Sequence, residues 1–200
     1  MAAKKLVDFG PIGEKLVGMI GAARDAFNRH SKAGLDQFKN LQEAVTKEID
    51  AALKNLEGQL AQAKVADQAQ LTLWQDLLKG LHRIVATLAG LGEPIYKKMK
   101  ENVLFSEKAV SQTNGLFDSQ AGLLRSVFDI MQTGNDYLKK FVQAEGSKTQ
   151  RDCADFATEH ETRLIEGLCT PKAAPIFLAI LDRFRTLAQQ QVEIVQHLKK

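Results

Sequence analysis

Leu77–Ile84 reads LLKGLHRI, and one hundred residues further on Phe177–Phe184 reads FLAILDRF. Apolar residues occupy matching places in the two copies, and each copy contains a leucine followed two residues later by an arginine. Both copies lie late in a run of residues with helical periodicity. Two halves that each end in a similar helix indicate a duplicated helical bundle.

The composition places the rest of the chain in the same class. The 200 residues are 44% hydrophobic and 26% charged, which is ordinary for a globular protein of one domain or two small ones. Strong helix formers dominate, and no alternating run of β-branched residues occurs, so we expect an all-α fold. The net charge of +3 is small and dispersed, which argues against nucleic acid as a partner.

Apolar residues in steps of three and four predict six helices, three in each half. The expected ranges are 12–29, 35–63, 67–91, 105–130, 137–168 and 171–198. The boundary between the halves is expected near residues 92–105. The predicted units are therefore residues 1–100 and 101–200, which form a tandem pair of three-helix bundles, related by a pseudo-twofold repeat, within one compact domain.

Turn-forming residues mark where these helices begin, end or bend. Ser31 or a nearby residue is expected to end the first helix, and Thr133–Asp136 to provide a stop, a turn and a new cap. Asp67, Ser106 and Thr170 are expected at helix starts, the last with Pro171 at the first helical position. The other expected interruptions are Gly90, Gly92 and Pro94, which weaken or kink the third helix, and Glu145–Lys148, where the fifth helix kinks or faces solvent.

Motifs for catalysis or cofactor binding are not found. The chain has no Glu-x-x-His pair for a di-iron bundle, no phosphate-binding glycine loop and no nucleophile motif. His160 stands between Glu159 and Glu161, which predicts a solvated, salt-bridged helix face. We therefore expect a protein that is not an enzyme and that binds no cofactor.

Location is inferred from two further features. Cys153 and Cys169 match no zinc or redox spacing, so reduced thiols in the cytoplasm are expected. The longest apolar stretches without charge are too short to cross a bilayer, and no signal-peptide core is recognised. The expected location is cytoplasmic, with contact to the inner membrane only through a partner.

Residues 159–183 resemble the C-terminal part of PhoU-like proteins, most closely the PhoU-like domain attached to bacterial sodium/phosphate cotransporters. The resemblance lies in three motifs: Arg163-Leu164-x-x-Gly167, the turn Cys169-Thr170-Pro171, and Leu181-Asp182-Arg183. It implies a fold of two three-helix bundles in tandem, in agreement with the periodicity.

PhoU-like proteins carry metal ions on pairs of acids four residues apart on the third and sixth helices. At the matching positions this chain has Asp182 with Thr186, and His82 with Ala86, so one acid of four remains. The resemblance therefore implies a degenerate metal motif, with His82 and Asp182 as the places to look for a metal ion.

The resemblance implies a regulator of phosphate uptake or phosphate signalling that docks on a membrane transporter or a sensor kinase. Arg83 and Arg183, one in each copy of the repeat, are the candidates for partner binding, because a guanidinium can grip a carboxylate or phosphate with two parallel bonds. The alternative is a scaffolding bundle that mediates protein–protein interaction with no role in phosphate. Homo-oligomerisation is left open.

Overall fold

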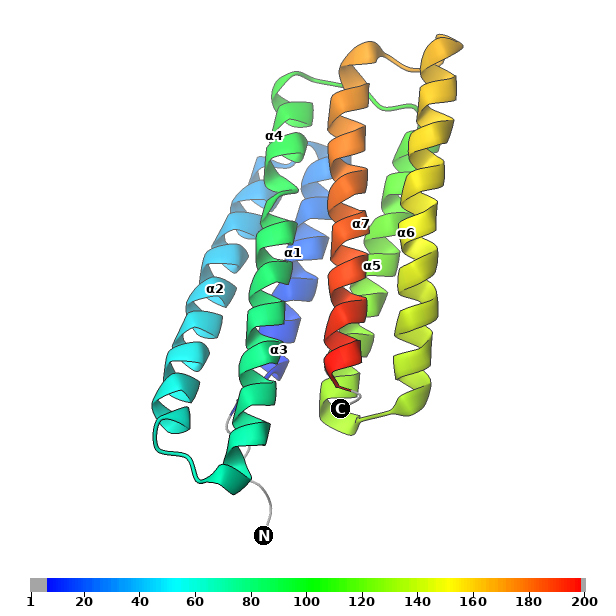
Figure 1. Ribbon diagram of the computed structural model, residues 1–200. Coiled ribbons are helices and arrows are strands. Elements are labelled where there is room, and N and C mark those ends of the chain that lie inside the picture. Colours follow the sequence, from blue (N-terminus) through cyan, green and yellow to red (C-terminus); the bar gives the residue numbers. More distant parts are fainter. Residues whose placement is uncertain (1–6, 199–200) are drawn as a thin grey trace.

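The computed structural model describes residues 7–198. All secondary-structure elements among these residues are helices, and none is a strand. The helices run in two antiparallel groups that stand side by side (Figure 1). The elements are α1 (Gly10–Arg29), α2 (Lys32–Leu60), α3 (Val65–Ala89), α4 (Gly92–Lys100), α5 (Glu107–Thr133), α6 (Asp136–Ile165), a 3₁₀ turn η1 (Pro171–Ala173) and α7 (Ala174–His197). The all-α fold of two three-helix bundles in tandem is confirmed.

Several predicted helix starts and ends are confirmed by their hydrogen bonds. The Ser31 hydroxyl accepts from the Gly34 amide at 2.9 Å, and the Ser106 hydroxyl accepts from the amide three residues on at 3.4 Å. Gly134 ends α5 in the left-handed region with φ of 66°, and the Asn135 side chain then caps α6. These residues satisfy backbone groups that a helix leaves open at its termini.

Other local predictions were wrong or incomplete. Asp67 lies inside the first turn of α3, whose N-cap is Lys64, and Thr170 makes no side-chain cap before η1. The expected third helix is divided into α3 and α4, since regular helix stops at Ala89 and restarts at Gly92. Glycine in a helix interior costs about 1 kcal/mol, which favours a break between Gly90 and Gly92.

Of the two alternatives for Glu145–Lys148, the kink is wrong, because α6 continues through this stretch as one helix, while Ser147 and Lys148 do face solvent. Gly146 is buried, and a Cβ atom placed there would collide with the Val192 side chain of α7. A residue with no side chain therefore lets α6 and α7 approach each other closely. Gly146 therefore has a packing role that the sequence analysis did not anticipate.

A chain of phenylalanine rings joins the two bundles. Phe27 of α1 contacts Phe105 with 5.5 Å between ring centroids and Phe117 of α5 with 6.0 Å. Two rings of α7 complete the chain of contacts. Phe177 contacts Phe105 with 5.8 Å between ring centroids, and Phe184 contacts Phe117 with 4.9 Å. Edge-to-face pairs of this kind add about 0.5–1.5 kcal/mol each beyond the apolar area that they bury. The two halves therefore share one core.

Candidate functional site

The two copies of the repeated octapeptide lie on helices that pack against each other. The first copy belongs to α3 and the second to α7, and these helices run antiparallel at the junction of the bundles (Figure 1). In each copy most apolar residues are buried, with Leu178 as the more exposed member at 36%. The repeat therefore builds the interface between the halves, and its polar residues flank this interface.

Arg83 of α3 forms an ion pair across the interface with Glu193 of α7. Its side chain is 56% exposed, and its Nη2 atom lies 3.7 Å from Glu193 Oε2 of α7. An exposed ion pair of this length contributes roughly 0–1 kcal/mol. The pair is therefore weak enough to open when a competing carboxylate or phosphate from a partner approaches.

Arg183, the matching residue of the second copy, has a different environment. Its side chain crosses the junction between α3 and α4, where a Cβ atom at Gly90 would lie 2.6 Å from Arg183 Nε. No ion pair involving Arg183 is found among residues 7–198. The guanidinium borders a hollow between α4 and α7 and keeps its hydrogen-bond donors available.

The two candidate metal residues each have their own neighbour. His82 Nε2 lies 3.6 Å from Asp50 of α2, and Asp182 accepts a hydrogen bond of 3.1 Å from Arg185. Asp182 also borders a second hollow beside the buried Cys153 of α6. The structure does not bring His82 and Asp182 to one place. Within the described range, no three His, Cys, Asp or Glu side chains gather where they could hold a metal ion.

The interpretation of His160 as a solvated residue was wrong. Its side chain is 1% exposed, neither ring nitrogen has a hydrogen-bond partner, and the ring packs on Phe177 with 4.8 Å between centroids. Burial, aided by the charge of Arg163, lowers the pKa of His160 below its ordinary value. A signal was present in the sequence, because Gly146, Cys153 and His160 recur every seven residues along one face of α6.

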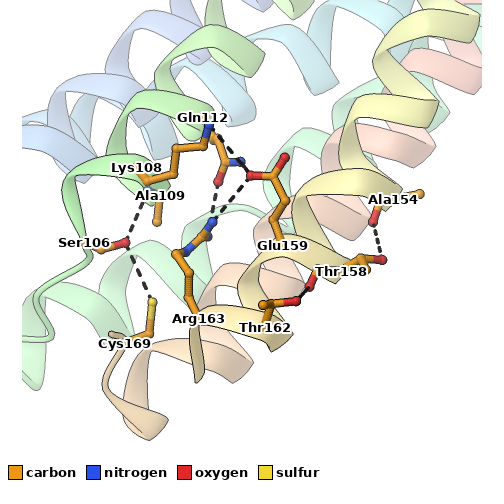
Figure 2. A network of polar contacts seen from close by, with 10 residues as sticks. All are labelled: Ser106, Lys108, Ala109, Gln112, Ala154, Thr158, Glu159, Thr162, Arg163 and Cys169. Atoms are coloured by element: carbon orange, nitrogen blue, oxygen red, sulfur yellow. Dashed lines mark hydrogen bonds and ion pairs between the residues drawn. The ribbon is translucent and has the colours of Figure 1, made fainter. Parts of the chain in front are cut away.

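Glu159 and Arg163, on the same helix as His160, belong to a polar network with α5 (Figure 2). The Gln112 side-chain amide donates to Glu159 Oε2 at 2.9 Å, and Arg163 Nη2 donates to Gln112 Oε1 at 3.3 Å. Nearby, the Cys169 thiol donates to the Ser106 hydroxyl at 3.7 Å (Figure 2). This network fastens the end of α6 and the following turn to the start of α5, and it has no nucleophile–base pair.

A buried lysine links the same end of the molecule to α1. Lys98 is 5% exposed, and its ammonium group donates to the Phe27 carbonyl oxygen at 2.9 Å and lies 2.6 Å from His30 Nε2. The Phe27 ring centroid is 4.8 Å away, which adds a cation–π contact. Burial lowers the pKa of Lys98, and burial together with the Lys98 charge lowers that of His30.

Fold and site together define an all-helical protein of two three-helix bundles, with exposed charged residues beside the interface of α3 and α7. No family model and no curated protein matches this sequence. A search of solved structures does find matches. The chain is similar to PhoU from Pseudomonas aeruginosa, with 12% identity, a TM-score of 0.84, and coverage of 94% of this chain and 90% of that one.

It is also similar to the phosphate transport system regulatory protein PhoU from Streptococcus pneumoniae, with 15% identity, a TM-score of 0.80, and coverage of 94% and 87%. At such identities the likeness establishes the fold. The chain therefore has the PhoU fold, as the resemblance of residues 159–183 implied. No helix within the described residues is long and apolar enough to cross a membrane.

Proposed function

We propose that this protein is a non-enzymatic regulator of phosphate uptake or phosphate signalling. One observation carries the proposal: the PhoU fold extends over 94% of the chain, and one of the matching proteins is named a phosphate transport system regulatory protein. The protein acts in the cytoplasm by docking on a partner, either a membrane phosphate transporter or a sensor kinase. Contact with the membrane is made through that partner.

The docking face lies along the interface of α3 and α7. Arg83 meets Glu193 on α7, and Arg183 lies ten residues earlier on the same helix, so the two arginines are about 15 Å apart along its axis. Both are exposed and project from helices whose inner faces are buried in a shared core. Two exposed guanidinium groups on rigid helices can engage two separate carboxylates or phosphates of one partner.

Regulation in this protein does not rest on a metal cluster of the PhoU-like type. His82 and Asp182 pair with Asp50 and Arg185, and the positions four residues on are Ala86 and Thr186. A single carboxylate and a distant imidazole offer too few oxygen ligands for a hard metal ion. Recognition by the arginines is therefore the mechanism that we propose.

The test uses the native host. A deletion strain is complemented with the wild-type gene, with Arg83→Ala/Arg183→Ala, or with Arg151→Ala, an exposed arginine of α6 that serves as the control. We expect deletion to change the rate of phosphate uptake, and the double variant to restore it less well than wild type or the control.

Capture of the transporter or kinase on tagged protein should fall in parallel with uptake control, while circular dichroism of the double variant stays helical. Unchanged phosphate uptake in the deletion strain would exclude the proposal and favour the scaffolding alternative. Full restoration by the double variant would place the docking face elsewhere on the molecule.

A further inference from the structure

We propose that the hollow between α4 and α7 is a binding site for a small oxyanion, with phosphate as the best-matched ligand. This inference goes beyond docking, because it concerns a free small molecule bound by the chain alone. The hollow has a volume of about 190 Å³. A single water needs roughly 10–15 Å³ of such space, so a tetrahedral oxyanion can be accommodated.

The hollow is lined by two cations from different helices. Lys97 comes from α4 and Arg183 from α7, and Glu93 is the one carboxylate in the lining. Neither cation has an ion-pair partner among residues 7–198, and Glu93 makes no ion pair there with Lys97 one turn away. The lining therefore has an excess of positive charge that an anion can neutralise.

The Arg183 side chain lies directly over the backbone of Gly90. A Cβ atom at Gly90 would lie 2.6 Å from Arg183 Nε, 3.0 Å from Cδ and 3.1 Å from Cζ. Any other residue at position 90 would therefore push the arginine away. The backbone φ of Gly90 is −61°, an ordinary helical value, so the glycine is needed for this close approach and not for its conformation.

The internal repeat supplies a comparison within the molecule. Arg83 occupies the matching place in the first copy and is neutralised by Glu193 at 3.7 Å. Arg183 has no such carboxylate and borders a hollow together with a second cation. The two copies therefore share a sequence pattern, while only the second has an unpaired guanidinium beside an open space.

The chemistry of the lining favours phosphate over a single carboxylate. A guanidinium offers two parallel N–H donors to two oxygens of one group, and the lysine adds a point charge for a third. A carboxylate has two oxygens and one negative charge, so it cannot satisfy both cations equally well. The apolar side chains of Pro94 and Ile176 border the same space and reduce competition from water.

The experiment titrates the purified full-length protein with inorganic phosphate and follows ¹H–¹⁵N spectra at constant ionic strength, set with sodium chloride. We expect saturable shifts of the Ala179 and Glu93 amides, which border the hollow. Arg183→Ala and Lys97→Ala should each weaken binding about tenfold or more, since a hydrogen bond to a charged group has that value. Gly90→Ala keeps every charge and moves the Arg183 side chain, so it should weaken binding less than Arg183→Ala does.

Arg151→Ala, which removes an exposed arginine of α6 away from the hollow, is the control and should leave phosphate binding unchanged. If Arg151→Ala and Arg183→Ala weaken binding equally, the effect comes from the overall charge of the protein and the proposal is overturned. Equal chemical-shift changes with chloride alone would overturn it in the same way. Tighter binding of acetate than of phosphate would also overturn it. A titration with glycerol phosphate tells whether the ligand is the free ion or a phosphate ester. If only inorganic phosphate binds, the site takes the free ion; if both bind, it also accepts phosphate esters.

Circular dichroism and urea midpoints of each variant separate loss of binding from loss of fold. No partner protein is present in this assay, so a negative result leaves the docking proposal untouched. Conversely, saturable phosphate binding would stand even if deletion of the gene had no effect on phosphate uptake.

Discussion

Replacing His160 by leucine should stabilise the protein, although it removes a fully buried side chain. The imidazole is 1% exposed, and both of its nitrogens lack a hydrogen-bond partner. An unpaired polar group in the interior costs about 1–3 kcal/mol. Leucine avoids that cost and is also a slightly better helix former, worth a few tenths of a kcal/mol within α6.

One favourable contact is lost in the exchange. The His160 and Phe177 rings pack with centroids 4.8 Å apart and an interplanar angle of 47°, and such a pair is worth about 0.5–1.5 kcal/mol. The two effects leave a net stabilisation of about 0–2 kcal/mol near pH 7.5 for His160→Leu. Urea unfolding followed by circular dichroism measures it.

The dependence on pH gives a second, independent signature. Burial lowers the pKa of His160 in the folded protein below its ordinary 6.5, so the unfolded chain binds the proton more tightly. Wild-type stability is therefore lost as pH falls below 6.5, at up to about 1.4 kcal/mol per pH unit. The advantage of His160→Leu should therefore widen between pH 7.5 and pH 5.5.

His82→Leu, at an exposed position of α3, is the control and should change stability by about 0.5 kcal/mol or less at pH 7.5. A His160→Leu protein that is more than about 1 kcal/mol less stable than wild type would refute the reasoning, because it would mean that the imidazole has a favourable partner. If the stability difference between His160→Leu and wild type is the same at both pH values, the pKa of His160 is not lowered in the folded protein.

The remaining predictions concern metal, thiols and the buried lysine. Purified protein should contain no stoichiometric iron, manganese or zinc; elemental analysis that finds one, released by Asp182→Ala, would contradict this. The Cys153 thiol is buried with its pKa raised to about 12, so in native protein at pH 8 a disulfide reagent should modify Cys169 first, and equal rates would contradict the structure. Lys98→Ala should lower the free energy of unfolding in urea by about 2–4 kcal/mol, because it removes the buried aliphatic side chain and the hydrogen bond to the Phe27 carbonyl oxygen. Lys98→Met keeps a side chain of similar length and should lower the free energy of unfolding by less.

Local features of the fold were predictable because short-range chemistry decides them. Ser31, Ser106 and Asn135 cap helices with their own side-chain oxygens, and Gly134 supplies a left-handed residue, so each can be recognised within four residues of sequence. The interruption near Gly90 and Gly92 follows from the same kind of reasoning, although its division into two helices does not.

Features that depend on a distant neighbour were misjudged. Residues 145–148 were expected to kink α6 or to face solvent, but Val192 of α7 packs against Gly146, and no local pattern shows that contact. His160 was assigned to solvent because of its acidic neighbours, although a helix places adjacent residues about 100° apart, so charged flanks say little about the residue between them. The seven-residue spacing from Gly146 through Cys153 was the better guide.

The candidate site shows the same division between local pattern and tertiary setting. The sequence placed Arg83 and Arg183 at equivalent positions, and the fold keeps them on equivalent helices, yet Glu193 neutralises only the first. Arg183 instead lies where α4 follows α3 after a break, and α4 places Lys97 and Glu93 beside it. A duplicated fold thus gives two similar helices different electrostatic surroundings. Any functional difference between the halves is therefore expected to centre on the α4–α7 hollow.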